Sequence, residues 1–447
     1  MGKYEVTKRL SEFAYETKYS DIPEDILQFT KCLTLKTVSG MIAGSSKTSG
    51  QKLARIIKRR NLPEDVGIIG GGFKAPLWEA VFLNAFFAHA SELEDDRIGG
   101  GGVSWDITVI PLLFPLAEKL KLSGKILLEA LVIGLEVHTR TCLFFNENIG
   151  IDVIPGALGP AVGGARALGL SAHKITQAMG LAMSGVPLTF LNWGTDGHCF
   201  ESSMHSLQGI LAAEMAQEDM SSNPDIVTYL TKLIGKEYVK PEKIIEDLGK
   251  HWVLRDIWIK KYPCCFFNHR QIDALITTMR EYNISYEDIE MVQVDGTTTD
   301  EICDRPKPRS EGDLMFSFQN TLGAAMLSGD VNLEHFTSEA LDDPKLIEAR
   351  SKVKVVIHPD WHSVLLEEPA HITLRTRTGK EYSVQRKYVI GSPQEPLSVD
   401  DFRSLYVKFT KHLLPEKEIK NTREAILHLE ELPDIQDLMN KLVYKRL

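Results

Sequence analysis

The chain has 447 residues and a formal net charge of −10, with 43% hydrophobic and 25% charged residues. This length exceeds one typical domain and supplies a sizeable apolar core, so two packed units with a cleft between them are expected. The composition excludes extended disorder, and the acidic balance excludes a surface that follows nucleic-acid phosphates, which needs clustered lysine and arginine. An anionic ligand would therefore depend on a few local cations.

The N-terminal stretch "MGKYEVTKRLSEFAYETKYS" carries the spaced charges of an amphipathic helix and lacks the apolar core of a signal peptide. The most apolar stretch, "KILLEALVIGLEV", is interrupted by Glu129 and Glu136 and falls short of a membrane span. We therefore expect a soluble, cytoplasmic protein that does not enter a membrane.

From Lys3 to about Trp258, apolar residues three and four apart predict an all-helical region. In "SDIPEDILQFTKCLTLKTVSGMIAGS", Pro23 stands at a favoured helix start and Gly44 supplies a stop. The stretch "GALGPAVGGARALGLSAHKITQAMGLAMSG" predicts a buried helical hairpin, because its small residues allow close helix contact. Ser171 is the expected N-cap of its second helix.

After Pro263 the pattern changes to period two, with the β-branched residues of strands, in "DIEMVQVDGTTTDE", "SKVKVVIHPDW" and "HITLRTRTGKEYSVQRKY". Gly379 marks a hairpin turn within the last of these. From Val399 onward the pattern returns to helix. The sequence thus predicts a mainly α protein with a smaller α+β domain.

The six cysteines lack the paired spacings of a zinc site, and a disulfide between the neighbours Cys264 and Cys265 would be strained. We interpret all six as thiols. The glycine runs "IIGGGF" and "RIGGGGVSWD" do not match a phosphate-binding loop. No metal and no cofactor are therefore expected.

Four segments, in order, resemble the MmgE/PrpD family, whose members include 2-methylcitrate dehydratase, cis-aconitate decarboxylase and iminodisuccinate epimerase. They are "LWEAVFLNAFFAHASELEDD", "ARALGLSAHKITQAMGLA", "KKYPCCFFNHRQIDA" and "DLMFSFQNTLGAAMLSGDV". The resemblance implies a discontinuous all-helical domain (1–258 and 399–447), an inserted α+β domain (259–398) and a homodimer. It also implies an active site between the domains, where acidic, lysine and histidine side chains act on a small carboxylate.

Position by position, the resemblance is uneven. Glu92 stands where the family usually has aspartate, and His198 occupies a lysine position. Lys260 matches the family's later lysine, whereas Cys265 falls where histidine often stands and Asn320 where tyrosine is frequent. Asp95 and His269 also stand at positions of the matching segments, and Asp96 falls where threonine is common in the family. Before "VIP", where relatives have histidine, this chain has Ser104 followed by Trp105. The scaffold is kept, and the chemistry is expected to have shifted.

Abstraction of a proton beside a carboxylate needs a base, and the resulting enolate needs a cation. Lys260 is our first catalytic candidate, either as a desolvated neutral base or as a charged carboxylate holder; a solvated lysine is the alternative. His198 can exchange a proton near neutral pH, or simply cap a helix. Cys265 suits two-base inversion, or only packs. Asp95 completes the catalytic candidates.

The expected substrate-binding residues surround these candidates: Glu92, Asp96, Arg97, Ser104, Trp105, His269 and Asn320. For the acidic cluster the alternative is solvation or pairing with Arg97, and for His269 it is a structural hydrogen bond. Trp105 is a candidate lid residue on the glycine-rich loop.

The leading hypothesis is a cofactor-independent, dehydratase-like lyase that acts on a small hydroxy-polycarboxylate through an enolate-like intermediate. An epimerase or isomerase of a small dicarboxylate is the second hypothesis, favoured by Cys265. The third is a carboxylate-binding protein that has lost catalysis, suggested by the altered positions.

Overall fold

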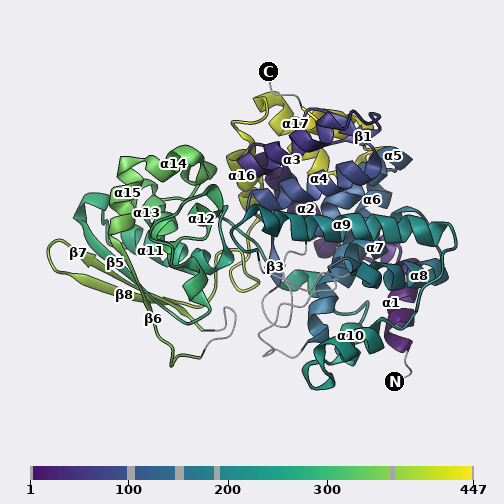
Figure 1. Ribbon diagram of the computed structural model, residues 1–447, viewed down its shortest axis with the longest axis horizontal. Helices are drawn as coiled ribbons and strands as arrows, with labels where there is room; N and C mark the ends of the chain where they lie inside the picture. The colour runs from purple at the N-terminus through teal and green to yellow at the C-terminus, as the bar shows by residue number, and fades with distance from the viewer. Residues whose placement is uncertain (1–3, 98–105, 146–155, 186–191, 363–367, 445–447) are drawn as a thin grey trace.

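The computed structural model describes residues 4–97, 106–145, 156–185, 192–362 and 368–444. A large helical unit and a smaller unit built on a sheet lie side by side (Figure 1). The first ten helices belong to the helical unit: α1 (Glu5–Glu16), α2 (Glu24–Gly44), α3 (Thr48–Arg59), α4 (Leu77–Ala90), α5 (Asp106–Leu120), α6 (Gly124–Arg140), α7 (Leu158–Ala167), α8 (Ala172–Ala182), α9 (Asp196–Gln217) and α10 (Ile226–Ile234). No helix within the described ranges is both long and apolar enough to cross a lipid bilayer.

The C-terminal helices rejoin the helical unit, as the resemblance implied. They are α16 (Val399–Thr410), α17 (Glu416–Leu427) and α18 (Gln436–Leu442). Figure 1 shows α16 and α17, in yellow, beside the first helices of the chain. Tyr406 and Met439 share one core with Leu33 of α2. The discontinuous helical domain with an inserted α+β unit is therefore confirmed.

The crossover between the two cores lies in the segment predicted to bridge the domains. Ile257 and Ile259 pack in the helical core, whereas Trp258 and Tyr262 pack in the core of the smaller unit. A domain limit at residue 258 fits this change of core. Both limits, at residues 258 and 399, stay predictions.

The smaller unit contains one four-stranded sheet in the order β6-β5-β7-β8. Its strands are β5 (Ile289–Gly296), β6 (Val353–Ile357), β7 (Ala370–Thr376) and β8 (Glu381–Arg386). β5 pairs with β6 in parallel and with β7 antiparallel, and β7 and β8 form the predicted hairpin. Its helices are α11 (His269–Glu281), α12 (Glu311–Met315), α13 (Phe318–Ser328), α14 (Ser338–Asp342) and α15 (Pro344–Ser351).

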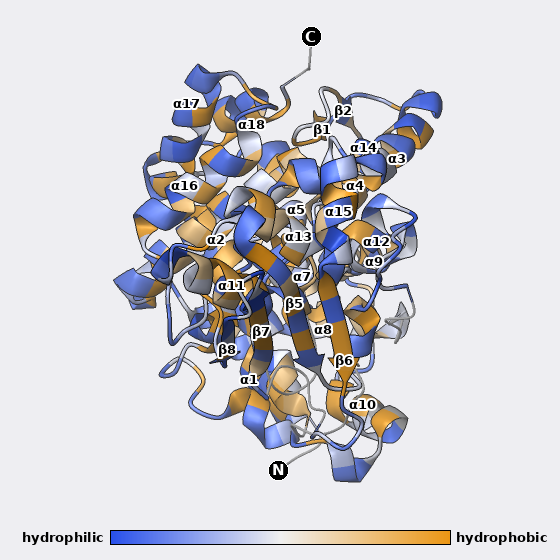
Figure 2. Ribbon diagram, turned by 90° about the vertical axis from the view of Figure 1, so that its left-hand side faces the viewer, coloured by the Kyte–Doolittle hydropathy of each residue, from blue (hydrophilic) through white to orange (hydrophobic). Residues whose placement is uncertain are grey.

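The alternation that predicted the strands reflects a sheet with one covered face. Along β7 every second residue is buried, beginning with Ala370. Figure 2 looks toward this unit and shows hydrophobic and hydrophilic residues interleaved along β5. Gly379, at the hairpin turn, has a φ of 81°, a backbone conformation that favours glycine.

The local signals predicted in the helices also hold. α2 begins directly after Pro23 and ends at Gly44. The hydroxyl of Ser171 caps α8 by accepting the Lys174 N–H at 3.4 Å. The described cysteines are all free thiols.

Close contact between α2 and α4 positions the chain that follows α4. A Cβ added at Gly44 would lie 1.8 Å from the carbonyl oxygen of Phe87, so only glycine permits this approach. One turn earlier, the wall of α2 at Gly40 faces Ser91. Lys36 on the same helix is thereby placed beside residues 93–95.

His138 gives a test of the helical core. This α6 side chain is fully buried, and burial, followed by the nearby His205, lowers its pKa to about 3. Because the folded pKa lies below the unfolded one, its stabilisation is present above pH 6.5 and is lost as the pH falls toward 3, by about 1.4 kcal/mol per pH unit. The stability advantage of the wild type over His138→Gln should therefore shrink across this range in urea unfolding at several pH values. If the difference in the free energy of unfolding between the two proteins did not change with pH, His138 would not be a buried neutral imidazole.

Candidate active site

A cavity of about 600 Å³ lies between the helical unit and the α+β unit. The helical unit contributes residues from the start of α3, the end of α4 and the start of α9, and the other unit contributes α12 and its neighbours. The titratable lining residues are Lys47, Lys52, His89, Glu92, Asp196, His198, Cys199, Arg309, Glu311 and Asp313. Cations and acids thus meet in one cavity between the domains.

Glu92 enters this cavity from the end of α4. Its φ is 54°, in the left-handed region that glycine usually occupies after a helix. Strain of this kind persists where the surroundings hold it. Here Lys260 holds it, because the ammonium lies 3.2 Å from Oε1 of Glu92 and 3.4 Å from its carbonyl oxygen.

Two imidazoles stand beside Glu92. The rings of His89, in the last turn of α4, and His198, in the first turn of α9, have centroids 4.1 Å apart. Nδ1 of His89 lies 2.8 Å from the hydroxyl of Ser202, which donates to the carbonyl of Cys199 at 3.1 Å. Nε2 of His89 lies 3.9 Å from Oε1 of Glu94.

His198 does not cap its helix. That role belongs to Thr195, whose hydroxyl accepts the N–H of Gly197 at 3.2 Å. His198 is buried, lines the cavity, and has Glu201 3.7 Å from its Nδ1. Burial, followed by the neighbouring His198, keeps the pKa of His89 well below its ordinary value, so His89 is neutral.

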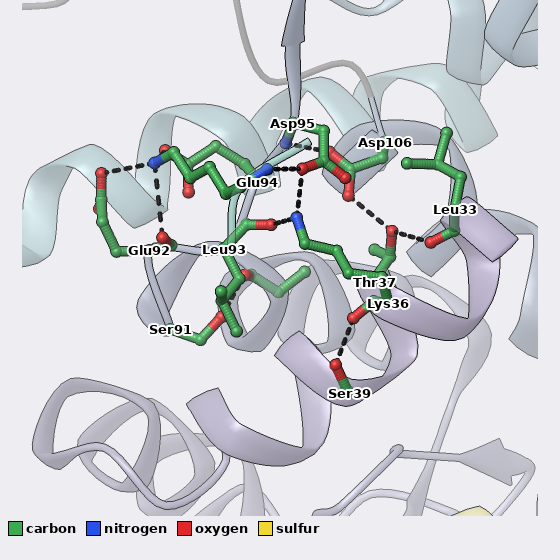
Figure 3. Close-up of polar contacts among 12 residues, drawn as sticks. Leu33, Lys36, Thr37, Ser39, Ser91, Glu92, Leu93, Glu94, Asp95 and Asp106 are labelled. Carbon is green, nitrogen blue, oxygen red and sulfur yellow. Dashed lines mark hydrogen bonds and ion pairs between the residues drawn. The ribbon is translucent and has the colours of Figure 1, made fainter. Parts of the chain in front are cut away.

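Lys260 is buried at the centre of a carboxylate network. Its ammonium pairs with Glu94 as well as Glu92, and its backbone N–H donates to Oδ1 of Asp95 at 2.7 Å. Lys36 pairs with the same Asp95 and with the carbonyl of Leu93, as Figure 3 shows. The solvated alternative for Lys260 is therefore wrong.

The two glutamates that share Lys260 differ in charge. Burial raises the pKa of Glu94, but the charge of the Lys260 ammonium and its hydrogen bond to Glu94 outweigh burial and lower this pKa to about 2. Burial, followed by repulsion from Glu94, raises the pKa of Glu92 well above its ordinary value. Burial disfavours the charge of Lys260, yet Glu92 and Glu94 raise its pKa well above the ordinary value. The geometry favours a charged Lys260 beside a protonated Glu92.

Asp95, Asp96 and Arg97 are not among the described lining residues of the cavity. Asp95 is fully buried, and its amide N–H donates to Asp106 at 2.8 Å. Asp96 and Arg97 form the short strand β3 (Asp96–Arg97), which pairs with β4 (Ile257–Trp258). Nε of Arg97 lies 3.5 Å from Oδ2 of Asp256.

Three further candidates lie inside the α+β unit. His269 stacks on Phe266 and lies 3.2 Å from the carbonyl of Cys264, which matches its structural alternative. The amide of Asn320 donates to two carbonyls and accepts from Arg350 at 3.0 Å. Cys265 is buried and is not among the described lining residues of this cavity. Ser104 and Trp105, with the proposed lid loop, lie outside the described residues.

Three residues that line the cavity were not among the predicted site residues: His89, Lys47 and Arg309. His89 belongs to the quoted segment "LWEAVFLNAFFAHASELEDD", three residues before Glu92, and this position was its only signal in the sequence. Lys47 and Arg309 lie in polar loops that carry no motif. Only the fold places Lys47 and Arg309 in the same cavity as His89.

One group of described residues has metal-ligand geometry. Ligand atoms of His89, Glu92 and His198 lie within 4.8 Å of one another. Two imidazoles and a carboxylate suit a first-row transition metal. Glu92, however, already pairs with the Lys260 ammonium, which would repel a second cation. The absence of a metal cofactor stays a prediction.

The sequence matches the MmgE/PrpD N-terminal domain over residues 8–234 and the MmgE/PrpD C-terminal domain over residues 262–431. The chain therefore belongs to the MmgE/PrpD family. It is 24% identical to cis-aconitate decarboxylase of Mus musculus, with 98% of this chain and 93% of the relative covered. It is 25% identical to the cis-aconitate decarboxylase-like protein oryM of Aspergillus oryzae, covering 97% and 96%. It is 23% identical to the cis-aconitate decarboxylase of Homo sapiens, with 98% of this chain and 94% of the relative covered.

These relatives are named as decarboxylases, a class of lyase. The sequence-based expectation of an enzyme of the lyase kind is thus confirmed.

Proposed function

We propose that this enzyme is a lyase that decarboxylates a small unsaturated polycarboxylate of the cis-aconitate type in the cavity between its two units. The observation that carries the proposal is that cations, among them Lys47 and Arg309, line the cavity together with Glu92, whose pKa is raised well above its ordinary value by burial and by repulsion from Glu94. The cations suit the carboxylates of the substrate, and the carboxylic acid suits a carbanion that needs a proton. The near full-length match to cis-aconitate decarboxylases supports decarboxylation over the dehydration that the sequence favoured.

The reaction requires one bond to break and one proton to move. The bond from the substrate skeleton to the departing carboxylate breaks, and carbon dioxide leaves. The electron pair delocalises across the double bond into a remaining carboxylate, giving an enolate-like carbanion. Glu92 then donates its proton to carbon, a step in which a positioned acid contributes about 10²–10⁴-fold. Lys260 stabilises the resulting Glu92 carboxylate, because its ammonium lies 3.2 Å away.

His198 is our candidate for returning the proton to Glu92. It lines the cavity beside Glu92 and stands against the ring of His89. Neutral His89 is the hydrogen-bond partner of His198 in this proposed relay. Lys260 acts as a charged partner in this scheme, one of the two roles considered from the sequence.

No cofactor is part of this proposal. Epimerisation gains no support here, since the described cavity lining does not contain the thiol of Cys265. A cytoplasmic homodimer remains our prediction, which light scattering of the purified protein and fractionation of cells would test.

The test is proton NMR of the purified protein in deuterated buffer with cis-aconitate, citrate, 2-methylcitrate and tricarballylate. The proposal predicts loss of cis-aconitate, release of carbon dioxide and one new carbon-bound deuterium in the product. Dehydration of citrate or 2-methylcitrate without decarboxylation would replace it with a hydro-lyase. Deuterium exchange with an unchanged skeleton would favour the epimerase, and silence across the panel would favour a non-catalytic protein.

A further inference from the structure

Lys47 lies at the junction of two cavities. It immediately precedes α3 and lines both the 600 Å³ cavity and a neighbouring cavity of about 380 Å³. Its side chain crosses from the helical unit to the α+β unit, where its ammonium donates to the carbonyl of Phe336 at 2.8 Å. The residue is 6% exposed.

Buried lysines in this protein otherwise have carboxylate partners. Four lysines are buried in the described part of the chain: Lys31, Lys36, Lys47 and Lys260. Lys31 pairs with Glu430 at 2.7 Å, Lys36 with Asp95, and Lys260 with two glutamates. Among the described residues, Lys47 has no carboxylate oxygen within 4.0 Å and one hydrogen-bond acceptor for its three N–H groups.

Glu311 is the acid whose charge acts on Lys47, but its carboxylate has other hydrogen-bond partners. Oε1 of Glu311 accepts the hydroxyls of Thr48 at 2.8 Å and Ser338 at 2.9 Å. Glu311 thus connects the start of α3 to the α+β unit, while Lys47 lines both cavities. Burial lowers the pKa of Lys47 to about 8, although Glu311 opposes this shift. A buried cation without a counter-charge is costly, and an anionic ligand would offset that cost.

We infer that Lys47 binds a substrate carboxylate in the larger cavity, forming a carboxylate subsite apart from Glu92 and Lys260. The ligand class is a di- or tricarboxylate, in which one carboxylate pairs with Lys47 while another part of the molecule reaches Glu92. This inference rests on the proposed function for the identity of the ligand, but it concerns binding and needs no turnover.

Calorimetric titration with tricarballylate, a saturated tricarboxylate, tests the inference. Lys47→Met should weaken binding about tenfold or more, because a desolvated charge pair is lost. Its melting temperature without ligand should not fall, since the variant no longer buries an uncompensated charge. Lys47→Gln keeps a donor for the Phe336 carbonyl but lacks the charge, so it should fold and show the same loss.

Two matched controls locate the subsite. Lys58 stands in the last turn of α3, is exposed and is not among the described lining residues of either cavity, so Lys58→Met should bind nearly as the wild type does. Lys408 lines only the smaller cavity and pairs with Asp330 at 2.8 Å, so Lys408→Met should also retain affinity.

Unchanged affinity in folded Lys47→Met and Lys47→Gln would overturn the inference, as would a wild type that binds no tricarballylate. Loss of affinity only in Lys408→Met would overturn the placement in the larger cavity. Binding lost in the Lys47 variants of a protein that never turns over cis-aconitate would uphold the subsite and reject the reaction. Turnover with unchanged KM in those variants would reject the subsite and leave the reaction standing.

Discussion

Replacement of Glu92 by glutamine is expected to lower kcat for decarboxylation by about 10²–10⁴-fold. Glutamine keeps nearly the same shape but cannot transfer the proton that quenches the carbanion. The left-handed backbone at this position stays occupied by a residue of the same length. Steady-state kinetics with cis-aconitate, together with circular dichroism of both proteins, measures the effect.

The matched control is Glu218→Gln, at the exposed end of α9, which should leave kcat unchanged. If Glu92→Gln retained full kcat, the proton would come from another group, and His198 would become the candidate. If KM alone rose, Glu92 would be a substrate-binding residue.

Replacement of Lys260 by alanine is expected to lower the free energy of unfolding by roughly 3–5 kcal/mol. The ammonium is buried between Glu92 and Glu94, and its removal leaves the ionised Glu94 buried without a counter-charge. Urea unfolding followed by circular dichroism measures the loss. The result would separate a charged network member from a neutral catalytic base, whose removal would stop turnover with little change in stability.

Lys261→Ala provides the control at the next residue. The Lys261 side chain is 29% exposed, and its ammonium lies 3.9 Å from Asp273. Asp273 keeps the hydroxyl of Tyr262 at 2.8 Å and the N–H of Ile390 at 2.9 Å as partners, so this replacement should change the free energy of unfolding by only about 0–1 kcal/mol. Equal stabilities of Lys260→Ala and the wild type would contradict the buried network.

The sequence was sufficient for the architecture because local signals and hydrophobic period agree along the chain. Pro23 and Gly44 bracket α2, and Gly379 turns the β7–β8 hairpin. The segments of period two form strands β5 to β8, all of which follow the change of core between Ile257 and Tyr262. The return of the last helices to the first unit needed the family resemblance, since periodicity does not say which core a helix joins.

The site was predicted only in part, because it depends on contacts between distant segments. Glu92 and His198 line the cavity, whereas Lys260 is not among its described lining residues and forms an ion pair with Glu94. Asn320 looked like a binding residue by position, yet Arg350, thirty residues later, occupies its carbonyl. No sequence pattern indicates a role for Lys47. What distinguishes this residue is the lack of a carboxylate partner among the described residues, which only the folded structure reveals.

The most direct test of the account is a crystal structure with tricarballylate bound. The account predicts the ligand in the 600 Å³ cavity, with one carboxylate at about 2.7–3.2 Å from the ammonium of Lys47 and its carbon skeleton facing Glu92. A ligand bound elsewhere on the protein, or in this cavity with Lys47 and Glu92 both out of contact, would contradict it.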